Sequence, residues 1–250
     1  MPRLRPPAGV AYMYSYIAPL LCVAIGVLIY KKRVLDATGT ALAVVMGVLI
    51  YFFAGFAWLV LLFCFLFLGF ATTKYKYAYK RRLKVSEPDG GRRRAINVIA
   101  NGALPTVFAG LSALSGGAAF FTAGYIASVA TVTADTLSSE LGVLSRRKPV
   151  LITSFKEVPP GTNGGITLLG ELAGIGGALL IGVLGYALGM GSAALCLISA
   201  LVGGILGFNI DSLLGATFER WGLLSNAGVN FVASMAGGLF GAGAALYLIR

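Results

Sequence analysis

The sequence predicts an all-α fold: a polytopic bundle of seven or eight transmembrane helices that forms one integral-membrane domain over residues 1–250. The chain is 58% hydrophobic and 12% charged, whereas a soluble domain carries roughly 25% charged residues. Apolar runs of about 17–25 residues, long enough to cross the hydrocarbon core of a bilayer, recur along the sequence. Glycine is abundant (35 residues). Much of it falls at small-xxx-small spacing, which lets helix backbones approach closely in lipid.

Each expected helix follows from one apolar run. The first run ends in Lys31-Lys32-Arg33 without a small-residue cleavage pattern, so it reads as a membrane helix and not as a cleaved signal peptide. The last three runs carry the glycine pairs Gly170/Gly174, Gly185/Gly189, Gly203/Gly207 and Gly237/Gly241. The total falls to seven if 35–54 or 117–139 does not cross completely. The expected helices are 13–30, 35–54, 56–73, 95–115, 117–139, 167–189, 192–216 and 226–249.

Charge gives the orientation of this bundle. With these helices, every basic residue except Arg3, Arg5 and Arg250 falls on one side of the membrane. The positive-inside rule assigns that side to the cytoplasm and the N-terminus to the outside. We therefore expect a multi-pass protein of a prokaryotic plasma membrane, with cytoplasmic loops near 74–94 and 141–166. The net charge of +11 then needs no nucleic-acid partner, and no residue pattern favours a particular oligomeric state.

The acidic residues are also one-sided. All nine fall in the expected cytoplasmic loops or the adjacent helix ends, although the positive-inside rule hardly constrains acids. A transporter would be expected to place polar or charged groups near the bilayer midplane. An enzyme that acts on a lipid head group would place them at one face, and this distribution favours such an enzyme over a transporter or scaffold.

Three absences narrow the chemistry. The chain has no histidine, which removes histidine metal sites, the usual general base and any Ser-His-Asp triad. Cys22, Cys64 and Cys196 stand singly in apolar segments and match no metal or disulfide spacing. No Gly-Lys pair exists in the chain, so a Walker A phosphate loop is excluded.

The candidate metal ligands begin with a helix end between residues 127 and 142. Thr131, Asp135 and Ser138 or Ser139 share one helical face there, and Thr136 lies one turn before Glu140. The plain alternative is a solvated helix end whose acids pair with neighbouring arginines. The functional interpretation is a Mg²⁺ ion held by Asp135 and Glu140, with phosphate oxygens and waters completing its shell.

A glycine-rich turn follows the basic loop after that helix. Gly161, Thr162, Asn163, Gly164 and Gly165 precede the next helix, an arrangement that suits an anion because backbone N–H groups are free there. An ordinary loop is the alternative, since glycine and asparagine favour turns. The phosphate interpretation gains from three nearby charged residues: Lys148, Lys156 and Glu171.

Further polar residues stand near the cytoplasmic ends of other helices. Asparagine pairs occur at helical spacing, and they serve either interhelical hydrogen bonding or ligand contact. An Asp followed by a small residue recurs at three helix ends, which suggests that several helices each contribute one carboxylate. The basic, tyrosine-rich run 73–82 reads mainly as an interfacial anchor, although one or two of its lysines, Lys74, Lys76 and Lys80, could reach a nucleotide or lipid phosphate. These further candidates are Asp36, Lys76, Asn97, Asn101, Asp211, Ser212, Asn226 and Asn230.

These residues resemble a multi-pass membrane family, formerly of unknown function, that includes plant phytyl-phosphate kinase. The matching segments run in order along nearly the whole chain: Leu35-Asp36 to Gly39, Thr73-Lys74-Tyr75-Lys76, Gly90-Gly91-Arg92, Ala100-Asn101-Gly102, Ala134-Asp135-Thr136 to Glu140, the 161–165 turn, Asp211-Ser212 to Ala216, and Val229-Asn230. A more distant similarity links the chain to dolichol kinase and CDP-diacylglycerol synthase, which use CTP and Mg²⁺.

The resemblance implies a kinase that transfers phosphate from CTP, or another nucleoside triphosphate, to a polyprenyl monophosphate such as phytyl or geranylgeranyl phosphate. Asp135 and Glu140, with Asp211 or Asp36, would hold Mg²⁺, and the 161–165 turn with two lysines would hold the nucleotide. Lys76 and Asn101 would meet the acceptor. A cytidylyltransferase that makes a CDP-lipid and a prenyl alcohol kinase are the enzymatic alternatives. An ionised phosphate acceptor needs no general base, which suits a chain without histidine.

Overall fold

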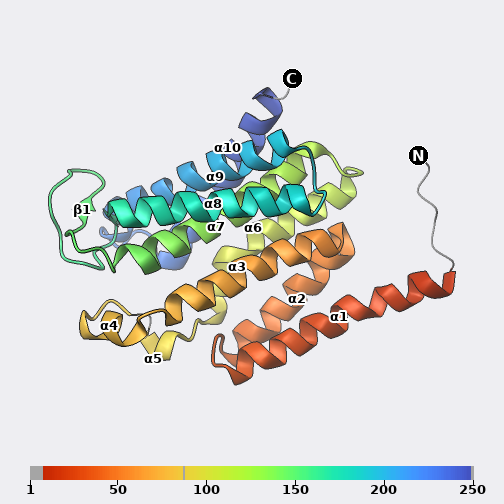
Figure 1. Cartoon of the computed structure of the whole chain (residues 1–250), viewed down its shortest axis with the longest axis horizontal. Coiled ribbons are helices and arrows are strands. Elements are labelled where there is room, and N and C mark those ends of the chain that lie inside the picture. Colours follow the sequence, from red (N-terminus) through yellow and green to blue (C-terminus); the bar gives the residue numbers. More distant parts are fainter. Residues whose placement is uncertain (1–7, 87, 249–250) are drawn as a thin grey trace.

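The computed structural model describes residues 8–86 and 88–248 (Figure 1). Long helices form wherever the sequence predicts an apolar run, with ends within a few residues of the predicted ones, so the all-α membrane bundle is confirmed. They are α1 (Ala8–Lys31), α2 (Ala37–Ala54), α3 (Phe56–Lys74), α6 (Ala95–Leu114), α7 (Ala119–Gly142), α8 (Leu168–Ala187), α9 (Ala193–Leu214) and α10 (Asn226–Leu248).

The short elements gather at one end of the bundle, which is the left end in Figure 1. Helices α4 (Tyr77–Arg82) and α5 (Pro88–Gly91) follow α3, and the strands β1 (Val150–Leu151) and β2 (Gly165–Ile166) pair antiparallel in the loop after α7. A π-helix, η1 (Gly215–Glu219), continues α9. The polar loops therefore lie together, as their shared charge pattern predicts.

Helix α7 is the central helix of the bundle. It packs against α3, α6, α8, α9 and α10, and Tyr125, Ala127 and Val129 on it have no exposed surface. Within the described residues, six helices are long and apolar enough to cross a membrane, and α7 is not among them; α1 adds a shorter apolar stretch, Ile17–Lys31. Serine and threonine lower the hydropathy of α7, which contacts other helices instead of lipid.

Glycine allows α7, α9 and α10 to pack backbone to backbone. A Cβ at Gly203 would lie 2.6 Å from the carbonyl oxygen of Gly237, and one at Gly241 would lie 3.1 Å from Cα of Gly203. Thr131 on α7 donates a hydrogen bond to the carbonyl of Gly203 at 3.0 Å. These glycines do pack helices, as predicted. Gly189 differs, because it lies beyond the end of α8 with φ of +72° and serves a turn.

The start of α2 is fixed to the start of α6. Asp36 caps α2 by accepting a hydrogen bond from the backbone N–H of Gly39 at 2.6 Å. Its own backbone N–H donates to the carbonyl of Arg93 at 3.0 Å, and the N–H of Arg93 donates to the carbonyl of Val34 at 2.9 Å. A Cβ at Gly39 would lie 3.2 Å from the backbone nitrogen of Ala95. This contact positions Arg93 at the polar end of the bundle.

Candidate active site

A polar cavity of about 240 Å³ opens at the end of the bundle where the short elements lie. Its walls come from α6, α7, the loop between α7 and α8, α9 with η1, and α10. Fourteen of the candidate residues named from the sequence line it: Asn97, Asn101, Asp135, Ser138, Ser139, Gly161, Thr162, Asn163, Gly164, Gly165, Asp211, Ser212, Asn226 and Asn230. The cavity therefore joins helix ends that are far apart in the sequence.

Two carboxyl groups from different helices meet in this cavity. Asp135 on α7 and Asp211 on α9 lie close enough for their side chains to share a hydrogen bond, and Glu219 lies close enough to add its charge. Two carboxylates close enough to share a hydrogen bond repel each other unless a proton or a cation lies between them. The pair is partly buried, so water screens that repulsion only partially.

These residues fit a magnesium ion. Within residues 8–86 and 88–248, no three His, Cys, Asp or Glu side chains are close enough to hold a metal between them. Mg²⁺, however, usually takes one or two carboxylates together with waters and substrate phosphates, not a full protein cage. Asp135 and Asp211 supply those two carboxylates, and the amide of Asn230 lies beside them.

The two asparagine pairs connect the carboxylates to α6. Asn230 lies 3.4 Å from Asn101 across the α6–α10 contact. With its amide oriented to suit its neighbours, Asn230 donates to Asp211 Oδ2 at 3.1 Å and to the carbonyl of Asn226 at 3.0 Å. Asn97 and Asn226 also line the cavity. Of the two alternatives that the sequence left open, interhelical contact is observed here, and ligand contact by these asparagines stays a prediction.

The glycine-rich turn packs directly on the π-helix. Gly164 has φ of +75°, and a Cβ there would fall 2.6 Å from the backbone nitrogen of Ala216. Asn163 hydrogen-bonds the carboxylate of Glu219. π-Helical turns are rare and recur at functional sites. Here the π-turn brings Gly215 and Glu219 against the turn, which closes one wall of the cavity.

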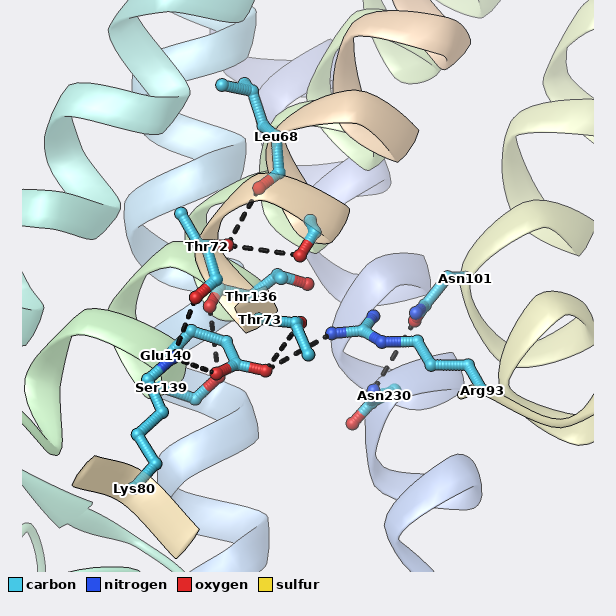
Figure 2. A network of polar contacts seen from close by, with 11 residues as sticks. Leu68, Thr72, Thr73, Lys80, Arg93, Asn101, Thr136, Ser139, Glu140 and Asn230 are labelled. Atoms are coloured by element: carbon cyan, nitrogen blue, oxygen red, sulfur yellow. Dashed lines mark hydrogen bonds and ion pairs between the residues drawn. The ribbon is translucent and has the colours of Figure 1, made fainter. Parts of the chain in front are cut away.

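A buried ion network stands behind the cavity wall (Figure 2). Lys80 Nζ lies 2.6 Å from Glu140 Oε2, and Thr73 donates to Glu140 Oε1 at 2.7 Å. Arg93 approaches the same carboxylate from the cavity side, with 3.9 Å between its Nη2 and Glu140 Oε1. Lys80 also donates to the carbonyl of Thr72 at 2.7 Å. Glu140 therefore orients Arg93 and does not itself line the cavity.

The cations that line the cavity are arginines. Arg93 and Arg147 are the basic residues on its described walls. The three predicted lysines lie elsewhere: Lys148 pairs with Glu157 on the surface at 3.2 Å, Lys156 is exposed, and Lys76 lies over the ring of Tyr75. Their predicted contact with phosphate stays a prediction without support from this arrangement.

Three other predicted residues also lie outside the cavity. Asp36 is the α2 cap, and Thr131 joins α7 to α9. Glu171, in the first turn of α8, has one carboxylate oxygen 3.5 Å from the Asn209 amide and the other buried without a partner in the described structure. All three residues contact other parts of the helix bundle, and none of them lines the cavity.

Three residues that line the cavity were not among the main candidates predicted from the sequence: Arg93, Arg147 and Glu219. Arg93 stands among three consecutive arginines, 92–94, of the basic loop near 74–94, and the β-bridge between it and Leu35 helps to place it at the cavity. Glu219 follows Asp211 and Gly215 along one helical face, which was a visible signal. Lys80 could not be singled out, because nothing in the run 74–84 marks one lysine as buried.

Comparisons with known proteins identify the relatives of this chain. The family model described as "Integral membrane protein DUF92" matches residues 20–238. An uncharacterized membrane protein of Methanocaldococcus jannaschii is 42% identical over 90% of this chain and 92% of its own. Protein PGR of Arabidopsis thaliana is 34% identical over 78% of this chain and 76% of its own. Protein VTE6, chloroplastic, from the same plant is 35% identical over 79% of this chain and 61% of its own. No solved structure matches the chain.

Proposed function

The chain belongs to the DUF92 family of integral membrane proteins, and we propose that its polar cavity is the active site of a kinase that phosphorylates a polyprenyl monophosphate. The observation that carries the proposal is the cavity itself, in which Asp135 and Asp211 face the 161–165 turn with Arg93 beside them. Carboxylates that suit Mg²⁺, a glycine-rich anion cradle and a guanidinium are the parts that phosphoryl transfer requires.

The charge distribution supports two phosphate subsites. The turn, the N-terminus of α8 that follows it and Arg147 suit the triphosphate, because a helix N-terminus and a guanidinium favour anions. Arg93, Asn97 and Asn101 form the wall of the cavity at the start of α6 and suit the acceptor phosphate. Mg²⁺ bound by Asp135 and Asp211 would neutralise phosphate oxygens between the two subsites.

The reaction balances without a general base. An oxygen of the prenyl monophosphate attacks the γ-phosphorus, the bond from that phosphorus to the β,γ-bridging oxygen breaks, and a prenyl diphosphate and a nucleoside diphosphate leave. The acceptor is already ionised at neutral pH, so the residues need to align two anions and offset their repulsion. Arg93 and Arg147 do so in a chain that has no histidine.

The proposed substrate class and nucleotide are supported by the family resemblance of the segments that line the cavity. The segments that resemble plant phytyl-phosphate kinase include Asp135-Thr136, the 161–165 turn and Asp211-Ser212, and these segments line the cavity. CTP is the proposed nucleotide because of the similarity to CTP-using lipid enzymes. We place the polar end of the bundle on the cytoplasmic side of a prokaryotic plasma membrane, where nucleotides are available, with the N-terminus outside.

Product analysis tests this proposal. Purified protein in detergent is incubated with geranylgeranyl or phytyl phosphate, MgCl₂ and CTP, with ATP in a parallel reaction. The proposal expects prenyl diphosphate and a nucleoside diphosphate. Release of pyrophosphate with a CDP-lipid would identify a cytidylyltransferase instead, and phosphorylation of the free alcohol in preference to its phosphate would identify an alcohol kinase. If neither CTP nor ATP is consumed with any of the acceptors, the result would favour a transporter or scaffold instead of an enzyme.

A further inference from the structure

A second, apolar cavity of about 80 Å³ adjoins the polar one. It lies among α1, α2, α3 and α6, and its walls are almost wholly hydrocarbon, from residues such as Ile25, Ala43, Met46 and Phe63. A narrow space of this kind suits a thin apolar chain better than a second polar group.

The two cavities share three wall residues, which are Arg93, Asn97 and Asn101. Arg93 lies just before α6, and Asn97 and Asn101 lie in the first half of that helix, so the start of α6 borders both cavities. Arg93 is the one charged residue among the described residues that line the apolar cavity. A guanidinium and two amides thus stand at the mouth of a hydrocarbon-lined space.

We propose that this apolar cavity binds the hydrocarbon tail of the acceptor lipid next to its phosphate, with Arg93 at the junction of head and tail. The proposal rests on the proposed function, because it assigns the tail of that same acceptor. The complementary ligand is an amphiphile with an anionic head and a narrow apolar chain: the head pairs with Arg93, and the tail displaces water from an apolar surface.

The surrounding packing gives the cavity a defined shape. Gly102 on α6 would place a Cβ 2.8 Å from Sδ of Met46, so α2 and α6 approach closely at that point. A Cβ at Gly47 would lie 3.3 Å from Sγ of Cys22, which holds α1 against α2. The tail site lies in the N-terminal half of the bundle, whereas the carboxylates and the turn come from the C-terminal half. The acceptor would therefore bridge the two halves.

Photolabelling of the wild-type protein tests this assignment. A geranylgeranyl phosphate analogue with a diazirine in its first isoprene units is bound in detergent, irradiated and mapped by peptide mass spectrometry, with unlabelled geranylgeranyl phosphate as competitor. Competed labels on α2, α3 and the start of α6, at positions such as Ala43 and Phe63, are expected. Competed labels confined to α8–α10, or no competed label, would overturn the tail site.

A matched pair of variants gives a second readout. Ala43 lines the cavity, and Val45 on the same helix is 53% exposed and does not line it. Ala43→Phe should lower kcat/KM for geranylgeranyl phosphate about tenfold, since a pocket contact of this size is typically worth 10–200-fold. It should leave KM for the nucleotide unchanged, and Val45→Phe should change neither. Equal effects of the two variants would contradict the tail site.

The outcomes separate the two proposals. Competed labels in the cavity without diphosphate formation would support the lipid site and overturn the kinase. Diphosphate formation with labels elsewhere would support the kinase and overturn the lipid site.

Discussion

Lys80 Nζ lies 2.6 Å from Glu140 Oε2, and the exposed fractions of the two side chains are 0% and 9%. The pair joins the segment after α3 to the end of the central helix, and it stands directly behind Arg93. Burying a lysine is costly unless its charge is paired and its protons are hydrogen-bonded. Here Glu140 and the carbonyl of Thr72 meet both conditions.

Removal of the Lys80 charge should destabilise the protein strongly. Lys80→Met leaves the Glu140 carboxylate buried without its main partner, and breaking a buried pair costs about 3–5 kcal/mol. Thermal unfolding in detergent measures the effect. Lys148→Met is the control, because its surface pair with Glu157 is worth about 0–1 kcal/mol. Lys80→Met/Glu140→Leu should recover much of the loss, and a single variant as stable as the wild type would show that the pair is not formed.

Replacement of Arg93 should weaken acceptor binding selectively. Hydrogen bonds to charged groups contribute about 1.5–3 kcal/mol, so Arg93→Gln should raise KM for the prenyl phosphate by about tenfold or more, with a smaller change for the nucleotide. Arg93→Lys should raise this KM less than Arg93→Gln does but should not restore the wild-type value, because a lysine cannot bind phosphate in a bidentate manner. Arg94→Gln is the neighbouring control, since Arg94 is exposed and pairs with Asp89 at 3.5 Å. An increase in KM for the nucleotide alone would contradict the placement of the acceptor at Arg93.

Adjacent cations in the loop after α7 should differ in their effects. Arg147 lines the polar cavity, and Lys148 does not. Arg147→Gln should raise KM for the nucleotide several-fold, and the effect should shrink as salt is added because Arg147 is largely exposed. Lys148→Gln should have little effect at any salt concentration. Initial rates at varied nucleotide concentrations provide the test. A larger increase in KM for Lys148→Gln than for Arg147→Gln would support the sequence-based prediction that Lys148 binds the nucleotide.

The turn should tolerate no side chain at Gly164. With φ of +75° and backbone atoms of α9 and of the π-helix within 3 Å of a new Cβ, Gly164→Ala combines a strained conformation with a clash. We expect at least a tenfold loss of kcat/KM for the nucleotide. Gly176→Ala makes the same chemical change on α8 where a Cβ would meet nothing within 4 Å, and it should leave activity intact. A Gly164→Ala enzyme with wild-type kinetics would separate the turn from the nucleotide site.

The helices could be predicted from the sequence because each follows from a long apolar run, and bilayer thickness alone determines such lengths. The role of α7 could not be predicted. Its alanines and threonines look like a weak transmembrane span, and they become the core only when five other helices surround them. Gly203 and Gly237 were identified as packing residues from the sequence, because helices that approach closely in a membrane need small residues at their contact.

The site was predictable where residue type determines the chemistry. Asp135, Asp211 and the 161–165 turn were expected to meet, and the cavity brings them together. The assignment of cations was weaker, since lysines and arginines crowd the polar end and their exposure depends on tertiary contacts. Glu140 shows the limit: its place in the sequence suits a metal ligand, and only the partner Lys80 shows that its carboxylate is already neutralised.

The most direct test of the central claim is transfer of the γ-phosphate from labelled CTP to geranylgeranyl phosphate by the wild type, Asp135→Asn and Asp211→Asn, with MgCl₂ titrated in each case. The account predicts diphosphate formation that EDTA abolishes and MgCl₂ restores. Each asparagine variant should lose at least 100-fold in kcat, because a bound metal contributes several kcal/mol of charge stabilisation. Full activity of Asp135→Asn, or wild-type turnover in EDTA, would contradict the assignment of these two carboxylates to the metal and with it the proposed active site.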